Sequence, residues 1–328
     1  MRLTFKELKD EVQKIVPKDI PYTVELEAGN IALVTPEPNR ILATDGLLAK
    51  ISHKVKRKIV LRPDTSIMKS EEDATKIVKE VIPESAGINQ IYFDACYREI
   101  TVQCDNPGEA VGRRGINLEQ IRDQSGWLIS VERTSPLISK TVHDIRGYRH
   151  AHAEERRKLL KDFGLNMHRP VRPGATWARV TALGSYREVG RACHFVTTNE
   201  SRVMIDVGVN IASDTDPMPY FTAPEALPLE KLDAVVLTHA HLDHAGMLPV
   251  LFKYGYRGPV YCTPPTRDLM LLLQTDYLKV GGSEGKRAPY SMEDIRTCMK
   301  HVVDVDWDET TDIAPDIKLT FSNAGHIL

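Results

Sequence analysis

Short apolar runs, some alternating and some at helical spacing, occur along the whole chain and predict a mixed α/β protein. Within residues 1–135 one order of elements occurs twice. The first copy, residues 1–66, predicts a helix ending before Pro17, strands at 22–26 and 31–34, a helix at 47–55 and a strand at 58–61. The second copy, residues 67–135, predicts a helix ending before Pro83, strands at 88–93 and 99–104, a helix at 117–124 and a strand at 127–131. This internal repeat indicates two small α+β modules in tandem.

The second copy carries a short glycine-bounded loop, Gly112-Arg113-Arg114-Gly115, between a strand and a helix. Glycines let a sugar-phosphate backbone come close, and the free N–H groups at a helix start attract phosphate. The loop and the order of elements resemble a KH domain, which implies binding of single-stranded RNA. The alternative is a tight turn with two solvated arginines.

The first copy differs at the corresponding loop. Aligned by its helix with an offset of seventy, it has Leu42-Ala43-Thr44-Asp45 there, without a glycine and with a negative charge. We therefore expect this KH-like copy not to clamp phosphates in the usual way. The basic run Lys54–Lys58 either contacts backbone charge or is a solvated helix end.

Residues 136–174 are expected to form a charged, exposed helix around 154–160, a stop at Gly164 and a stiff linker over 169–174. A solvated face is the preferred interpretation of the arginines in this region, with an extended RNA path as the alternative. These arginines are Arg146, Arg149, Arg156 and Arg157.

The remaining residues, 175–328, are rich in predicted strands, and the most informative stretch follows one of them. The buried run 232–237 leads into Thr238-His239-Ala240-His241-Leu242-Asp243-His244, and a helix is expected from Ala245 to Phe252. Such a position, between a strand and a helix, is a usual place for a site in an α/β layer. Three imidazoles and a carboxylate point to zinc first, with His239 and His241 on one ion and Asp243 and His244 on a second. A histidine-rich loop without metal is the alternative.

This loop resembles the signature of the metallo-β-lactamase superfamily, an αββα sandwich. By that resemblance His326, in Ala324-Gly325-His326, completes the shell of the first ion, and Asp206, at the end of the strand 203–207, supports the ligand loop from behind. For Asp206 the alternative is a carboxylate in a strand-end turn.

The stretch Glu188-Val189-Gly190-Arg191 narrows the resemblance to the β-CASP nucleases. Two KH-like modules before such a nuclease resemble the archaeal CPSF-like KH–β-CASP ribonucleases. That family's bridging Asp, β-CASP region and last His are not found before Leu328. We therefore expect an N-terminal part of a longer protein, cut after the third ligand motif and inactive by itself.

Composition and charge fit an ordinary globular protein. The 328 residues are 42% hydrophobic and 27% charged, with a net charge of -2, so RNA contact must come from local basic patches. Five cysteines without a C-x-x-C pair are expected to be reduced thiols. Residues 1–16 predict an amphipathic helix rather than a signal peptide, and no membrane span is expected, so the expected location is the cytoplasm.

Together these features predict an α+β fold of two KH-like domains followed by the N-terminal part of a metallo-β-lactamase sandwich. The resemblance implies a ribonuclease using two Zn²⁺ per site in the intact protein and acting in RNA 3′-end formation and transcription termination. Endonucleolytic cleavage is expected, and whether 5′–3′ exonucleolytic cleavage accompanies it stays open. The implied partners are single-stranded RNA, the transcription machinery including RNA polymerase, and a second copy in a full-length homodimer. The alternatives are an RNA-binding protein without activity and a metallo-hydrolase of small thioesters or lactones.

Overall fold

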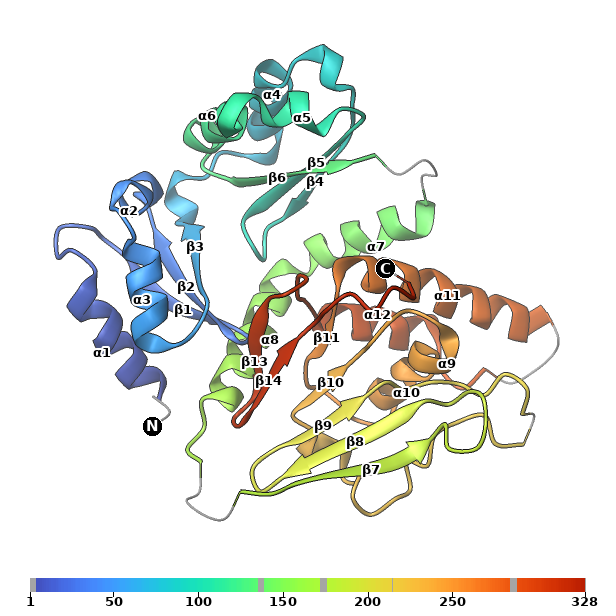
Figure 1. Ribbon diagram of the computed structural model, residues 1–328. Helices are drawn as coiled ribbons and strands as arrows, with labels where there is room; N and C mark the ends of the chain where they lie inside the picture. The colour runs from blue at the N-terminus through green and yellow to red at the C-terminus, as the bar shows by residue number, and fades with distance from the viewer. Residues whose placement is uncertain (1–3, 135–138, 172–175, 214, 284–287, 328) are drawn as a thin grey trace. The chain divides into compact units, whose positions relative to one another are not determined.

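A computed structural model describes residues 4–134, 139–171, 176–213, 215–283 and 288–327 (Figure 1). The chain divides into two compact units. The first contains residues 3–26 and 31–158, and the second contains residues 27–30 and 159–328. Among the residues described, no helix is both long and apolar enough to cross a lipid bilayer.

The first module of the first unit is a three-stranded sheet packed against helices. Its elements are α1 (Phe5–Ile15), β1 (Thr23–Glu27), β2 (Asn30–Thr35), α2 (Pro38–Ala43), α3 (Leu47–Val55) and β3 (Ile59–Pro63). The sheet has the order β1-β2-β3, and β2 and β3 run parallel. Helix α1 begins with a capping box in which Thr4 and Glu7 bond each other's backbone N–H groups. Leu8, Val12 and Ile51 of α1 and α3 are fully or almost fully buried and form the centre of the core.

The second module repeats this order. Its elements are α4 (Glu71–Val81), β4 (Ile88–Asp94), β5 (Glu99–Cys104), α5 (Pro107–Val111), α6 (Ile116–Ser125) and β6 (Leu128–Arg133), with the short 3₁₀ turn η1 (Thr65–Ile67) leading in. In the sheet β4-β5-β6, β4 and β5 are antiparallel and β5 and β6 parallel. The predicted repeat is therefore present. The helices α2 and α5 were not predicted because each is too short to show a helical period.

The structure corrects the alignment of the two loops. Helix α3 begins at Leu47 and α6 at Ile116, so the offset is 69 rather than seventy. The loop of the first module is then 43–46, and it ends in Gly46, at the position of Gly115. Both glycines have left-handed backbones, with φ of 65° and 80°. The first module thus lacks only the first of the two glycines, and the expectation that its loop has none was wrong.

Two helices follow the second module, α7 (Lys140–Ala151) and α8 (Ala153–Met167). Helix α8 was expected to be exposed and to stop at Gly164. It continues to Met167, and although Glu154, Glu155 and Lys158 are exposed as expected, one of its arginines is not. Arg156 is only 1% exposed, and Arg149 of α7 is buried as well. Neither arginine is therefore available as a surface contact for RNA. The sequence pattern misled because these two charged residues are buried beside a carboxylate, Asp94.

The second unit is built on one six-stranded sheet of order β12-β11-β10-β9-β8-β7 (Figure 1). The strands are β7 (Ala178–Gly184), β8 (Cys193–Thr198), β9 (Arg202–Ile205), β10 (Ala234–Val236), β11 (Val260–Cys262) and β12 (Val302–Asp304). Strands β9 to β12 are parallel, whereas β7, β8 and β9 pair antiparallel. Strand β8 alternates between buried and half-buried residues, so one face of the sheet is more deeply covered than the other.

The helices of this unit are α9 (Leu242–Ala245), α10 (Leu248–Lys253), α11 (Pro264–Ser283) and α12 (Met292–His301), with the 3₁₀ turn η4 (Leu229–Lys231) before β10. A hairpin of β13 (Thr310–Ala314) and β14 (Ile317–Thr320) follows. The helix expected from Ala245 to Phe252 is broken between α9 and α10 at Gly246 and Met247. Gly246 has no space for a side chain, because the Leu242 carbonyl oxygen would lie 2.5 Å from its Cβ.

Candidate metal centre

The histidine loop lies where the parallel strands β9 and β10 end. Asp206 follows β9, and Thr238 to His241 follow β10 and lead directly into α9. The two segments are in backbone contact, because the Val207 N–H donates to the His244 carbonyl oxygen at 2.6 Å. This is the edge of the sheet at which the sequence predicted a site.

Three imidazoles that are distant in sequence come together here. His326, in the segment after β14, has its ring centroid 5.1 Å from that of His239 and 5.2 Å from that of His241. One ring nitrogen of each residue can be chosen so that all three lie within 4.8 Å of one another. Nε2 of His239 and Nδ1 of His241 are 3.1 Å apart. His239 and His241 are half-buried and His326 is exposed, so the group is open to solvent on one side.

Asp206 lies behind the loop and is 3% exposed. Its Oδ1 accepts the backbone N–H of Thr238 at 2.8 Å, and its Oδ2 accepts the Thr238 hydroxyl at 2.8 Å. The same Oδ2 lies 2.8 Å from Nδ1 of His244. One carboxylate therefore fixes the first residue of the loop and the orientation of the last imidazole.

Asp243 and His244 occupy α9, beside the three-histidine group. Oδ2 of Asp243 lies 3.7 Å from Nε2 of His244, and the His239 and His244 ring centroids are 4.1 Å apart. Among the residues that the structure describes, neither Asp243 nor His244 belongs to the group whose nitrogens converge. The structure thus separates three converging imidazoles from two adjacent side chains, Asp243 and His244.

The surroundings shift the pKa values of two of these imidazoles in opposite directions. Burial lowers the pKa of His239, and the positive charge of His244 lowers it further. The hydrogen bond to Asp206 raises the pKa of His244, against the effect of its own burial. His239 is thus biased toward the neutral form, which is the form that coordinates a metal ion.

The arrangement fits a divalent transition metal. Imidazole nitrogens around Zn²⁺ lie about 2.0–2.1 Å from the ion in tetrahedral sites, so nitrogens that share one ion must approach within a few ångströms of each other. The three histidines meet this requirement and leave a side open, which is the donor set of a catalytic rather than a structural zinc site. No cysteine lies in the group, and the five cysteines are buried elsewhere and form no disulfide.

A second candidate site is the loop Gly112–Gly115 in the second module. Arg113 and Arg114 are exposed, and Arg114 has a left-handed backbone with φ of 54°. Gly112 has φ of 72° and ψ of 176°, a conformation open essentially to glycine alone. The Asn117 side chain lies beneath it, donating to the Glu109 and Ala110 carbonyls at 3.1 and 3.2 Å.

Three residues that support the histidine loop were not found from the sequence. Thr238 joins Asp206 to His239, because its hydroxyl also lies 3.0 Å from Nδ1 of His239. Gly208 has no space for a side chain, since the carbonyl oxygen of Asp243 would lie 1.6 Å from its Cβ. Gln274 of α11 is fully buried and donates to the Ala245 carbonyl at 2.8 Å, at the end of α9. Of these three residues, only Gly208 could have been noticed in the sequence, as the glycine directly after the predicted strand 203–207.

Comparison with known proteins gives a match in the first module and another in the second unit. Residues 201–327 match the family model described as a beta-lactamase superfamily domain, and residues 2–68 match the model described as the KH domain of transcription termination factor FttA. The transcription termination factor FttA of Methanosarcina mazei is 45% identical over 98% of this chain, and that of Methanocaldococcus jannaschii is 42% identical over 98%. The chain belongs to the archaeal KH–metallo-β-lactamase family.

Within this family the chain spans about half the length of the curated relatives it matches, 51% and 50% for the two named above. The expected combination of KH and metallo-β-lactamase folds is confirmed. The matched span 201–327 contains Asp206, the histidine loop and His326. Among solved structures, Rm3 metallo-beta-lactamase matches 45% of this chain and 50% of its own at 19% identity, with a TM-score of 0.29, which is too slight a likeness to carry an argument.

Proposed function

We propose that this chain is the RNA-binding and metal-holding part of a metal-dependent ribonuclease that acts in transcription termination. The observation that carries the proposal is the convergence of His239, His241 and His326 from segments far apart in sequence. The process, transcription termination, is proposed because the relatives are named as termination factors. The proposal includes endonucleolytic cleavage, with 5′–3′ exonucleolytic cleavage as an open alternative or addition. It also includes the transcription machinery as partner and dimer formation by the full-length protein.

In this proposal His239, His241 and His326 hold one Zn²⁺, and Asp243 and His244 contribute to a second. When bound at such a site, divalent cations acidify water and offset the negative charge that develops on phosphoryl oxygens. Asp206 is a positioning residue, since it orients Thr238 and His244 without belonging to the converging group. No side-chain nucleophile is required from the protein.

The proposed role of the second KH module is to hold single-stranded RNA. Gly112 and Gly115 leave both ends of the loop without a side chain, and α6 begins directly after Gly115 with no side-chain cap, so its N-terminus can face a phosphate. Arg113 and Arg114 add positive charge at the same place. The first module keeps Gly46 but has Ala43 in place of the first glycine, so we assign phosphate contact to the second module.

Metal analysis of the purified chain tests the first part. We expect at least one tightly held zinc ion per chain, lost in His241→Ala and in His326→Ala. His53→Ala, which removes an exposed histidine of α3 outside the group, is the matched control and should retain the metal. A wild-type chain that holds no transition metal after dialysis contradicts the proposal.

RNA binding and cleavage test the second part. Gly112→Asp combined with Gly115→Asp should weaken binding of single-stranded RNA, while metal content stays unchanged. In the full-length protein, His241→Ala should abolish cleavage of RNA and leave RNA affinity nearly intact. Binding without any cleavage by the full-length protein would instead support an RNA-binding protein without activity.

A further inference from the structure

A polar pocket of about 570 Å³ lies in the second unit, away from the histidines. Its lining includes Arg202, the first residue of β9, and Asp233, just before β10. Asp206 and Thr238 follow the other ends of these two strands, so the pocket and the candidate metal centre lie at opposite ends of the sheet. The volume falls within the range of about 300–1,000 Å³ typical of ligand sites.

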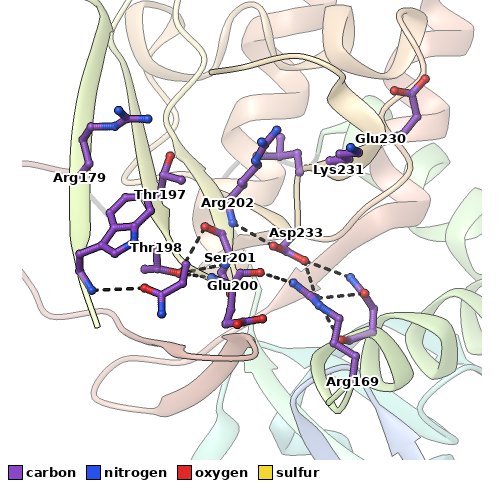
Figure 2. A pocket seen from close by; sticks show the side chains of 14 residues that line it. Arg169, Arg179, Thr197, Thr198, Glu200, Ser201, Arg202, Glu230, Lys231 and Asp233 are labelled. Carbon is purple, nitrogen blue, oxygen red and sulfur yellow. Dashed lines mark hydrogen bonds and ion pairs between the residues drawn. The ribbon is translucent and has the colours of Figure 1, made fainter. Parts of the chain in front are cut away.

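An aromatic ring and a guanidinium form one side of this pocket. Figure 2 shows Arg179 on the β7 side, with Arg202 across from it and Thr197, Thr198 and Ser201 between. Trp177, directly before β7, belongs to the same lining. Trp177 is 47% exposed, and the Arg179 guanidinium lies 5.8 Å from the centre of its ring. The Trp177 N–H donates to Oδ1 of Asn199 at 3.3 Å, which ties its backbone to the turn between β8 and β9.

The charged groups of the lining leave a small positive excess. The Asp233 carboxylate is already engaged, because it accepts from the Arg169 guanidinium at 2.7 Å and from the Arg202 N–H at 2.9 Å. In the part of the chain that the structure describes, no carboxylate forms an ion pair with the remaining three cations of the lining. These cations are Arg179, Arg202 and Lys231. They face two other carboxylates, Glu200 and Glu230, so the lining favours a ligand with negative charge.

We infer that this pocket binds a nucleotide of a single-stranded RNA, with the base on Trp177 and the phosphate toward Arg179, Arg202 and Lys231. A flat exposed ring beside a guanidinium is the arrangement on which unpaired bases stack, and nearby cations attract the backbone. An inorganic anion would use the cations but not the ring. The inference rests on the proposed function, because it assumes that the chain handles single-stranded RNA, and it adds a contact outside both KH modules.

The test is fluorescence anisotropy of a labelled uridine 12-mer, measured with the wild-type chain and with a chain carrying Gly112→Asp and Gly115→Asp. In both backgrounds Trp177→Ala should weaken binding about 5- to 100-fold, the range expected for loss of one base stack. Trp177→Phe keeps a stacking ring and should retain most of the affinity. Thermal unfolding should be unchanged, since Trp177 is half exposed.

The matched control is Tyr254→Ala. Tyr254 is 63% exposed and has the Lys253 ammonium 5.9 Å from its ring, but it does not line the pocket. Its loss should not change RNA affinity.

Several results would overturn the inference. They are unchanged affinity in Trp177→Ala, an equal loss in Tyr254→Ala, or displacement of the 12-mer by uridine monophosphate at the concentration of the 12-mer itself. Failure of the KH proposal has a different signature: the glycine variants would then bind as wild type while Trp177→Ala still lowers affinity.

Discussion

Asp206 illustrates how one residue organises the candidate metal centre. Its backbone has φ of 61°, a left-handed conformation that costs a side-chain-bearing residue about 1 kcal/mol or more. The conformation persists because the carboxylate receives two donors from Thr238 and one contact from His244. A carboxylate that accepts this many bonds in a buried position holds the loop in one geometry.

Asp206→Asn should therefore weaken metal binding without removing a ligand. The amide can accept from Thr238 but cannot also serve as an anionic partner for His244, so we expect zinc affinity to fall about 10- to 100-fold, as for other residues that orient metal ligands. Competition with a chromophoric chelator measures this affinity. Asp306→Asn, at an exposed carboxylate after β12, is the control and should leave affinity unchanged. An unchanged affinity in Asp206→Asn would remove its positioning role.

The two glycines of the loop proposed to bind RNA, Gly112 and Gly115, differ in the side chains they tolerate. A Cβ on Gly112 would meet the Asn117 amide at 2.8 Å, whereas a Cβ on Gly115 has nothing within 4 Å. We expect Gly112→Ala to lower the free energy of unfolding by about 2–3 kcal/mol and Gly115→Ala by about 1 kcal/mol. Denaturant titration measures both. Equal losses would contradict the role assigned to Asn117.

Among single residues, the sequence predicted those with an unusual density of ligand side chains. It missed those whose role depends on contacts with other segments of the chain. The histidines and Asp243 could be picked out because such a density of ligands is rare in a loop. Thr238 and Gln274 could not, because a threonine and a glutamine have no distinctive pattern. Their importance arises from Asp206 and Ala245, which lie in other segments.

At the scale of elements, α7 and α8 show that charged side chains of a helix can be buried against a neighbouring strand. Arg156 of α8 donates from Nη1 to both oxygens of Asp94, at 2.9 and 2.8 Å, and Asp94 is the last residue of β4. Burial alone would raise the pKa of Asp94, but the guanidinium charges of Arg156 and Arg149 hold the pKa below its ordinary value. The pair fastens the helix that follows the second module to a strand of that module.

This pair predicts a pH dependence of stability. Because the pKa of Asp94 is lowered in the folded state, its contribution is present above the unfolded pKa of about 3.9 and is lost as the pH falls through the lower, folded value. Asp94→Asn should cost about 2–3 kcal/mol near neutral pH, less than for a fully buried pair because Asp94 is partly exposed. Thermal unfolding of both proteins between pH 6 and pH 3 tests this, and the difference between them should shrink below about pH 4.

Element boundaries were predictable wherever the apolar period ran long enough. The helix at 47–55 and the strand at 99–104 were predicted with the bounds that the structure has. The break between α9 and α10 was not, because Leu248 to Phe252 continue the apolar pattern across it. There the Met247 N–H donates to the Val207 carbonyl at 2.8 Å instead of to a carbonyl of the helix, and only the folded chain contains that contact.

At the scale of the whole molecule, the two KH-type modules of the first unit are held together by a buried cation. Arg98, in the turn between β4 and β5, is 5% exposed. Its guanidinium donates to the Pro63 carbonyl at 3.2 Å and pairs with Glu25 at 3.4 Å, and both partners belong to the first module. Asn39 of the first module adds a bond to Asp123 of the second at 2.8 Å.

Arg98→Met should loosen this connection. The substitution keeps an apolar stem of similar length but leaves the Pro63 carbonyl and Glu25 without their donor. We expect a loss of about 2–3 kcal/mol, below the value for a fully buried pair because Glu25 is half exposed. Scanning calorimetry should then resolve separate transitions for the two modules. Asn39→Ala, at an exposed contact of the same interface, should leave a single transition, and separate transitions in the wild type would contradict the coupling.

The order of the domains was readable from the sequence, because the repeat and the histidine loop are each self-contained patterns. The contacts that join the modules were not, since Arg98 looks like any charged turn residue. Its burial depends on a neighbour more than thirty positions away, the Pro63 carbonyl.

The position of His326 has a consequence for the susceptibility of the protein to proteolysis. The segment carrying it is exposed from Ser322 to His326, and within the second unit its proposed tie to the histidine loop is the cation itself. A cation shared by His241 and His326 would close a loop of more than eighty residues, so its removal should expose Phe321–Ile327 to broad-specificity proteases long before the sheet melts. Proteolytic cleavage in this segment would then measure how much of a preparation lacks the proposed metal ion.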